Sequence, residues 1–161
     1  MKIRQEDLIK EIQKVFPGLR VTSFGVQDIY CGDPKYFLPM LHELKQFLAD
    51  DATSQKKYIE GKGDCNFFTS IVYAHCRERT WDKEELPWAF GEAWGTKFEG
   101  KHVSGQGLVL ENGMLRSVDT IAQHAVNICL TSDFGLQLIQ AQTDKTWAAK
   151  KLDDILVFAK F

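Results

Sequence analysis

A glycine-flanked cysteine at the start of an apolar helix is the feature that most constrains this chain. Gly61-Lys62-Gly63-Asp64-Cys65 leads into Asn66-Phe67-Phe68, and apolar residues then keep helical spacing to about Arg79. A helix this apolar is normally central in its domain. The first backbone N–H groups of a helix lack partners within it, and with the helix dipole they favour a thiolate. The sequence therefore predicts a central helix that carries a reactive thiol at its first residue.

Helical periodicity also marks the residues before this helix. Apolar residues fall on one face over 5–16, and Pro17-Gly18 ends that pattern. A second helix is expected from about Pro39 to Ala49, because Pro39 would break a helix that began at Asp33. Between the helices we expect an extended or irregular segment over 19–31, a short turn over 34–38 and a polar loop over 50–57.

After Pro87 the pattern changes from helical to strand-like. Asn112-Gly113 between two apolar runs is a strong hairpin signal, because this pair favours the tight turn that hairpins use. The expected strands are residues 88–94, 108–111, 114–118, 124–130, 136–142 and 154–158, with a glycine-rich loop over 100–107. Helices followed by an antiparallel sheet predict an α+β fold, with the helix from Cys65 packed on the sheet. The 161 residues are enough for one domain with a core, so residues 1–161 are expected to form a single domain.

Composition excludes several classes of protein. Hydrophobic residues make up 44% of the chain, which is typical of a globular protein, and a net charge of −2 argues against nucleic-acid binding. No apolar run approaches the ~20 residues that span a bilayer, and the N-terminus has no apolar signal core. We therefore expect a cytoplasmic protein with no membrane partner. Free thiols are expected, because no Cys-x-x-Cys pair occurs among Cys31, Cys65, Cys76 and Cys129.

Strand alternation places two polar side chains beside the helix. His124 shares a face with the apolar residues 126, 128 and 130 of its strand, and Gln140 and Gln142 share one with residues 136 and 138. The helix that begins at Cys65 is the natural element to cover this apolar face. That packing would bring Cys65 close to His124 and Gln140.

These residue types suit nucleophilic catalysis. A thiol at its ordinary pKa is only a few per cent thiolate at neutral pH, so a neighbouring imidazole has to take its proton. The imidazole then returns the proton to the leaving amine, and an amide oxygen can fix the ring by accepting from its other N–H. The hypothesis is that Cys65 is the nucleophile, His124 the base and Gln140 the orienting residue. The backbone N–H of Cys65 is a ready oxyanion donor.

The same residues have simpler interpretations. A cysteine in a helix is commonly a small buried residue, which we expect for Cys76 and Cys129 and keep as the alternative for Cys65. A histidine such as His124 is commonly structural. The adjacent His75-Cys76 is the one Cys/His pair of close spacing, and it points two ways on a helix, so we expect no metal and no cofactor. We expect Trp88, Trp94 and Trp147 in the core, with Trp94 alternatively lining a cleft beside His124.

The order and flanks of these residues resemble those of papain-like and transglutaminase-like proteins. Gly61-x-x-Asp64-Cys65-Asn66-Phe67-Phe68 resembles the nucleophile segment, where an Asp-Cys pair opens a long helix. Residues 90–95 resemble the strand before the histidine, His124-Ala125-Val126-Asn127 the His-Ala-x-Asn segment, and residues 139–144 an "Ile-Glu-Pro-Gln" ending. That ending belongs to a branch with the cysteine-protease domain of a mushroom agglutinin and uncharacterised bacterial and phage proteins. The likeness spans roughly residues 25–147.

The resemblance implies a thiol hydrolase that cleaves or transfers an amide or peptide bond through a thioester at Cys65. It gives His124 as base and Gln140 as third member, where the branch usually has an acidic residue. Asn66 and Phe67 stand where a second acid often follows, so no calcium dependence is carried over. The alternative is a catalytically silent binding or assembly module that retains the fold.

The resemblance also indicates supporting residues. Ile59 stands where papain-like enzymes keep an oxyanion-donating glutamine, so Gln55 or Tyr58 is expected to replace it. Gln142 is expected beside Gln140, and Trp94 near His124. The implied partner is a peptide or amide substrate.

Overall fold

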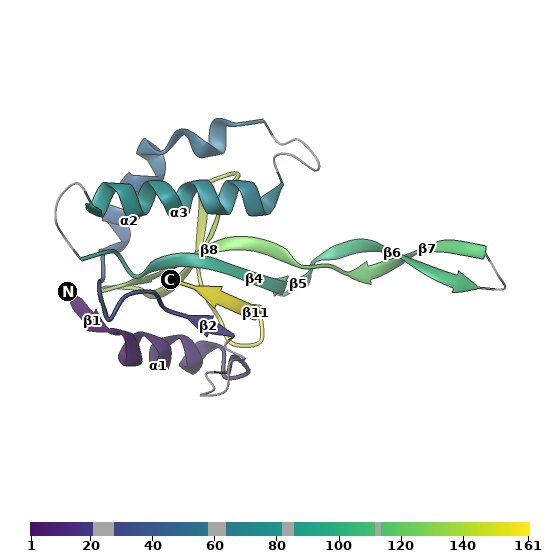
Figure 1. The fold of residues 1–161 in the computed structure, drawn as a ribbon, viewed down its shortest axis with the longest axis horizontal. Helices are drawn as coiled ribbons and strands as arrows, with labels where there is room; N and C mark the ends of the chain where they lie inside the picture. Colours follow the sequence, from purple (N-terminus) through teal and green to yellow (C-terminus); the bar gives the residue numbers. More distant parts are fainter. Residues whose placement is uncertain (21–27, 58–63, 82–85, 112–113) are drawn as a thin grey trace.

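A sheet with helices on both faces organises the molecule (Figure 1). The computed structural model describes residues 1–161 except 21–27, 58–63, 82–85 and 112–113. One helix covers the lower face in Figure 1 and two cover the upper face. The helices are α1 (Gln5–Val15), α2 (Leu41–Asp50) and α3 (Cys65–Trp81), with the short 3-10 helix η1 (Ala52–Gln55) after α2. The predicted α+β class, with helices packed on a mostly antiparallel sheet, is confirmed.

Seven strands form the central sheet. Its order is β10-β9-β8-β4-β11-β2, with β5 paired to β4, and only the β11–β2 pair among these is parallel. The strands are β2 (Ile29–Tyr30), β4 (Phe90–Phe98), β5 (Lys101–His102), β8 (His124–Thr131), β9 (Gly135–Gln140), β10 (Lys145–Ala148) and β11 (Ile155–Lys160).

Two further strand pairs stand outside this sheet. β1 (Lys2–Arg4) pairs with β3 (Lys35–Phe37), and β6 (Ser104–Glu111) pairs with β7 (Met114–Ile121). The β6–β7 pair extends far beyond the body of the molecule as a two-stranded arm (Figure 1). The predicted strands around Asn112-Gly113 therefore exist, while the turn residues themselves lie outside the described residues.

The three predicted helices are confirmed close to their expected ends. α3 begins at Cys65, and the Asp64 side chain accepts a hydrogen bond from the Phe67 N–H at 3.2 Å, which satisfies one of the free donors of the first turn. Its buried face consists of Phe68, Thr69, Val72, Cys76 and Thr80. The helix that the apolar pattern predicted to be central, α3, thus packs against the sheet.

The expectation about which face of the sheet α3 covers is wrong. The apolar residues of β8 and β9 that share a strand face with His124 and Gln140 pack against α1. Their core includes Leu8, Ile12, Val126, Ile128 and Leu138. α2 and α3 cover the opposite face, in a core that includes Leu44, Phe68, Val72, Cys129 and Ile139. Both faces of β8 are buried, and the face toward α3 carries the polar Asn127, which is buried and donates to the Thr69 carbonyl oxygen of α3. Alternation alone therefore favoured the other, more apolar face.

Several segments differ from their predicted form. Residues 100–107 hold β5 and the start of β6 where a loop was expected, because pairing with a neighbour stabilises strands that contain glycine. Residues 34–38 hold β3, which pairs with β1, and the loop over 50–57 contains η1. Strand β11 lies inside the sheet, between β4 and β2. The extended segment over 19–31 is described only in part, with β2 at its end.

None of the helices within the described ranges combines the length and the apolar character that crossing a bilayer requires.

Candidate active site

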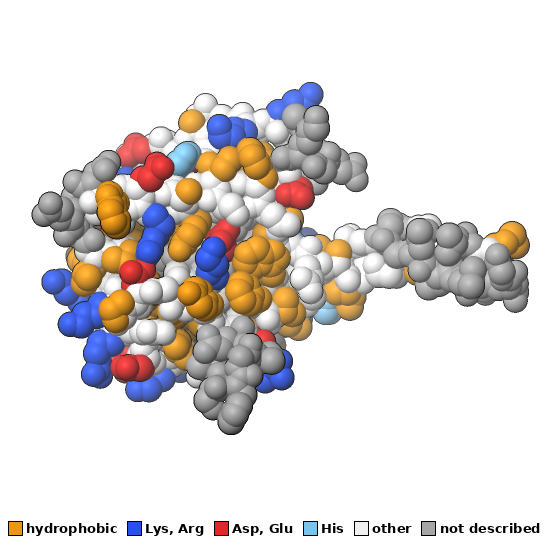
Figure 2. Space-filling view, viewed as in Figure 1, with side chains coloured by type: hydrophobic (Ala, Val, Ile, Leu, Met, Phe, Trp, Pro, Cys, Tyr) orange, Lys and Arg blue, Asp and Glu red, His pale blue; other side chains and the backbone are white. Residues whose placement is uncertain are grey.

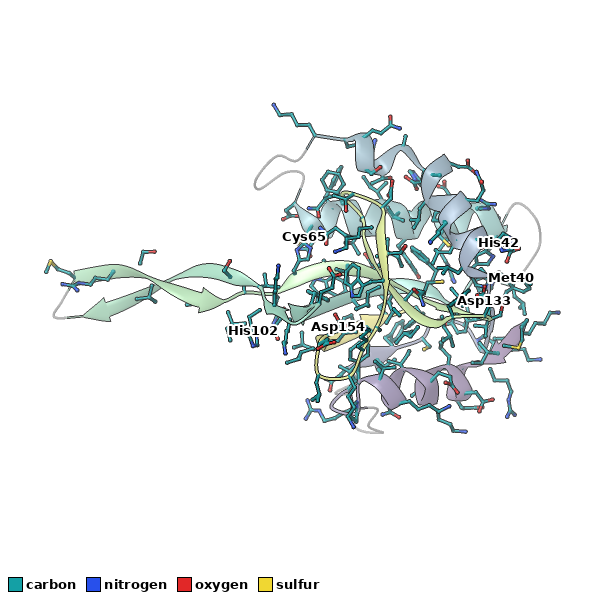
Figure 3. The ribbon with its side chains drawn as sticks, turned by 180° about the vertical axis from the view of Figure 1, so that it is seen from behind. Met40, His42, Cys65, His102, Asp133 and Asp154 are labelled. Atoms are coloured by element: carbon teal, nitrogen blue, oxygen red, sulfur yellow. The ribbon has the colours of Figure 1, made fainter. Side chains whose placement is uncertain are left out.

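Cys65 and His124 meet at the end of the sheet from which the β6–β7 arm leaves (Figure 3). Cys65 is the first residue of α3 and His124 the first residue of β8, and the thiol interacts with the imidazole. The backbone N–H of Ala125 also interacts with the Cys65 sulfur. Two adjacent residues of one strand therefore hold the thiol against the sheet.

Gln140 holds the other side of the imidazole ring. His124 Nε2 lies 2.9 Å from Gln140 Oε1, and the Gln140 side-chain amide donates to Gln142 Oε1. Because an amide oxygen only accepts, Nε2 carries the proton in this bond. The Nδ1 atom is then the ring nitrogen that remains for Cys65. His124 thus lies between the thiol of Cys65 and the side-chain amide of Gln140.

The electrostatics around Cys65 and His124 favour a thiolate and an imidazolium. The hydrogen bond from His124 lowers the pKa of Cys65, although partial burial opposes it, and the Ala125 N–H adds to the effect. The hydrogen bond with Cys65 raises the pKa of His124 against the opposing effect of burial, and Gln140 raises it further. The two shifts converge, so the proton transfer from sulfur to nitrogen is easier than between the isolated groups.

The other three cysteines behave in the opposite way. Burial raises the pKa of Cys31 to about 11 and that of Cys76 to about 12, and it raises the pKa of Cys129 well above its ordinary value. Cys76 and Cys129 are buried, as predicted. Cys65 is half-buried. All four cysteines are free and lie within the described residues.

The predicted supporting residues divide into three groups. Gln142 accepts a hydrogen bond from the side-chain amide of Gln140. Trp94 of β4 donates from Nε1 to Asn66 Oδ1 at 2.8 Å, next to the thiol. Gln55 is exposed in η1, and its part in oxyanion binding stays a prediction. Tyr58 lies outside the described residues. The backbone N–H of Cys65 belongs to the first turn of α3, whose donors have no partner within a helix, and its part in oxyanion binding also stays a prediction.

Three neighbours of the site were not predicted. Asn66 accepts from Trp94, the Ala125 N–H contacts the sulfur, and the Phe98 ring lies against His124 with centroids 6.0 Å apart. The contact between Phe98 and His124 depends on the register in which β4 pairs with β8, where Gly95 lies opposite His124. The other two contacts depend on how α3 packs on the sheet. For Asn66 and Ala125, the one signal in the sequence was that they directly follow Cys65 and His124. Phe98 had no such signal.

In the part of the chain that the structure describes, no cluster of three or more His, Cys, Asp or Glu side chains could hold a metal ion. The adjacent His75 and Cys76 diverge. His75 Nδ1 lies 2.9 Å from the carboxylate of Asp51, while Cys76 points into the core.

Apolar side chains are exposed near the candidate site. Figure 2 shows hydrophobic side chains between charged ones over the face on which α3 and β11 lie. Phe67, two residues after Cys65, is 43% exposed, and the Trp94 ring lies 5.4 Å from that of Phe158. Apolar surface is therefore available to a substrate beside the thiol.

The structure is similar to that of a lectin from the mushroom Polyporus squamosus. The PSL1a–E64 complex matches 99% of this chain and 51% of the lectin chain, with a TM-score of 0.68 and 14% sequence identity. Polyporus squamosus lectin bound to the human-type influenza-binding epitope Neu5Acα2-6Galβ1-4GlcNAc matches 99% of this chain and 49% of that chain, with the same TM-score of 0.68 and identity of 14%. The chain thus spans about half the length of these lectins.

No protein-family model and no curated protein matches the sequence. The structural match covers nearly the whole chain, so the likeness extends to all the layers of the fold and not to one motif. The expected papain-like fold, similar to the domain of a mushroom lectin, is confirmed.

Proposed function

We propose that the protein is a thiol hydrolase that cleaves an amide or peptide bond through a thioester at Cys65. The observation that carries this proposal is the placement of Cys65, at the start of α3, beside His124, whose Nε2 lies 2.9 Å from Gln140 Oε1. The directions of the pKa values agree with it, since His124 lowers that of Cys65 while burial raises that of each of the other three cysteines. Lowered thiol pKa values mark reactive cysteines, and raised ones mark inert buried cysteines.

The geometry supports a sequence of steps in which each proton is accounted for. His124 Nδ1 takes the proton of Cys65, and the sulfur attacks the carbonyl carbon of the substrate. The Cys65 N–H stabilises the oxyanion of the tetrahedral intermediate. That intermediate collapses, and the C–N bond breaks as His124 returns the proton to the leaving amine. A water molecule, deprotonated by His124, then hydrolyses the thioester and frees the sulfur.

The lectin of similar fold supports the same reading. PSL1a was obtained as a complex with E64. In the present chain Cys65 lies at the start of the central helix with His124 and Gln140 beside it, which is the arrangement a thiol-directed reagent requires. The four free thiols also favour a reducing compartment such as the cytoplasm.

Alkylation by iodoacetamide and by E64 tests the proposal. Because the pKa of Cys65 is lowered and that of His124 raised, Cys65 is expected to react at a lower pH than an ordinary thiol. His124→Ala removes the hydrogen bond and is expected to move the profile back toward that of a free cysteine. Mass spectrometry after digestion locates the label, and Cys31, with its pKa of about 11, is the internal control.

Cleavage itself is tested separately with a library of fluorogenic peptides and amides. We expect a rate that is bell-shaped in pH, since it falls where the thiolate is protonated and again where the imidazolium has lost the proton it gives to the leaving amine. Cys65→Ala is expected to abolish it. If Cys65 reacts no faster than Cys31 at neutral pH, the proposal fails.

A binding or assembly module with the same fold is the second candidate. The neutral Gln140 favours it, because an amide stabilises an imidazolium less than a carboxylate does. Fast alkylation of Cys65 without turnover of any library member would favour this candidate. Turnover only in the presence of an added amine would instead show transfer through the same thioester.

A further inference from the structure

A buried carboxylate behind the candidate site joins three separate segments. Asp154 is 3% exposed, and Figure 3 shows it at the same end of the sheet as Cys65. Its carboxylate accepts from the Glu99 N–H at 2.9 Å, the Lys150 N–H at 2.8 Å and Trp147 Nε1 at 3.1 Å. These donors belong to the β4–β5 turn, the β10–β11 connection and β10. One side chain therefore ties the β4–β5 turn to the distant segment that runs from Trp147 to Asp154.

Aromatic rings connect this carboxylate to the histidine. The Trp147 ring lies against Phe98, with centroids 6.2 Å apart at 83°, and Phe98 lies against His124, with centroids 6.0 Å apart at 80°. Edge-to-face contacts of this kind fix the tilt of a ring as well as its position. The imidazole is thus held by Gln140 at Nε2 and by Phe98 on its ring.

The β4 backbone is shaped for this contact. Gly95 lies opposite His124 in the β4–β8 pair, and a Cβ there would come within 2.6 Å of the Phe98 ring and 2.5 Å of the Ile155 carbonyl oxygen. Only a residue without a side chain lets the ring reach this place. Phe98 is directly followed by Glu99, whose φ of 49° is unusual for a residue with a side chain, and whose N–H is the one that Asp154 accepts.

We propose that Asp154 is a positioning residue for the candidate active site, which it serves by holding Trp147 and the turn after Phe98 so that Phe98 fixes the imidazole of His124. The inference rests on the proposed function for its catalytic meaning. Asp154 touches neither Cys65 nor the site of the substrate, so its effect is on the orientation of His124. Without it the strained turn at Glu99 and the ring of Trp147 lose their common anchor.

Asp154→Asn and Trp147→Phe test the two ends of this chain of contacts. Asn keeps the shape of the carboxylate but turns one acceptor into a donor that faces N–H groups. Phe keeps an aromatic ring but loses the five-membered part of the indole, and Nε1 with it. We measure the rate of Cys65 alkylation at pH 6.5 and at pH 9.5. Each pKa unit that Cys65 regains lowers its thiolate fraction at the lower pH by about tenfold, while the rate at the higher pH changes little. The expected result is a fall of roughly threefold to tenfold in the ratio of the two rates.

Asp51→Asn is the matched control, because Asp51 is also a buried carboxylate that accepts a backbone N–H, from Thr53, and has no contact with His124. It is expected to lower the melting temperature and to leave the ratio unchanged. If Asp154→Asn does not fold, Trp147→Phe and Phe98→Leu replace it, and the same fall in the ratio of the two alkylation rates is expected. Folded variants of Asp154, Trp147 and Phe98 with the wild-type ratio would overturn the proposal.

The failure of the proposed function is recognised separately. If wild-type Cys65 is unreactive at pH 6.5, the hydrolase proposal fails, and the positioning role is then read from the ¹⁵N NMR shifts of the His124 ring. Asp154→Asn is expected to weaken the Nε2–H signal of the bond to Gln140, and Asp51→Asn to leave it unchanged. An unaltered His124 signal in folded Asp154→Asn would overturn the positioning role.

Discussion

Gln140 occupies the place where a charge would act most strongly on His124. Its Oε1 lies 2.9 Å from Nε2, and its amide is held by Gln142. An amide oxygen fixes the orientation of the ring, while a carboxylate would also attract the imidazolium. The choice of glutamine therefore keeps the geometry of the pair and gives up part of its electrostatic stabilisation.

Gln140→Glu is predicted to strengthen the Cys65–His124 ion pair. The new carboxylate favours the protonated ring, so the pKa of His124 rises further and that of Cys65 falls further. The alkylation profile of Cys65 is expected to shift to lower pH, by roughly one unit for a partly buried charge beside the ring. Stopped-flow alkylation between pH 4 and 9 measures this shift.

Gln140→Ala is the control for this change, because it removes the acceptor without adding a charge. It is expected to shift the profile in the opposite direction, toward an ordinary thiol. Equal profiles for Glu, Gln and Ala at this position would show that the bond to Nε2 has no influence on the thiol.

At the scale of elements, one side-chain hydrogen bond ties the start of α3 to the sheet. Trp94 Nε1 donates to Asn66 Oδ1 at 2.8 Å, and the Trp94 ring also contacts Phe158 of β11. This bond is exposed, so its net contribution to the free energy of unfolding is expected at the low end, about 0.5 to 1 kcal/mol. It lies next to Cys65, which makes it part of what positions the thiol.

A double-mutant cycle tests this contribution. Asn66→Ala removes the acceptor and Trp94→Phe removes the donor while keeping an aromatic ring over Phe158. The coupling between the two, measured from urea unfolding of the four proteins, is expected to be about 0.5 to 1 kcal/mol. Additive effects would mean that the bond contributes nothing and that each residue acts through packing alone.

The elements also show how far sequence reasoning reaches. α3 was predictable from its first residue, because the glycines, Asp64 and the apolar face all mark one end of a buried helix. The pairing of β8 with β9 was predictable from two apolar runs and a short turn, and that hairpin brings Gln140 to His124. The face that α3 covers was not, because that side of β8 holds the polar Asn127, whose burial depends on its hydrogen bond to the Thr69 carbonyl oxygen of α3.

At the scale of the whole molecule, the candidate site is set by contacts between residues distant in the sequence. Gly95 lies opposite His124, and Lys97 lies opposite Ile155, because β4 is placed between β8 and β11. No local pattern encodes such a register, so Phe98 and Asp154 could not be found from the sequence. Cys65, His124 and Gln140 could, since each stands at the end of an element with its own local signal.

The β6–β7 arm is a second property of the whole molecule. It extends away from the sheet as a two-stranded ribbon, and such a ribbon alone is of marginal stability in water (Figure 1). At its base the Ala122 N–H donates to the Val103 carbonyl oxygen at 2.9 Å, and the Val103 N–H donates to the Thr96 carbonyl oxygen at 2.9 Å. The base is therefore held by the body and not by the outer part of the arm.

Replacing residues 104–121 by Asn-Gly is predicted to leave the body folded and the thiol reactive. Val103 and Ala122 already pair as the flanks of a tight hairpin, which a two-residue turn closes without strain. The free energy of unfolding in urea is expected to stay within about 1 kcal/mol of the wild type, since the arm adds a ribbon of marginal stability. Cys65 is expected to keep its alkylation profile, because His124 is held by Gln140 and Phe98. A slower reaction at pH 6.5 with unchanged stability would instead make the arm part of the site.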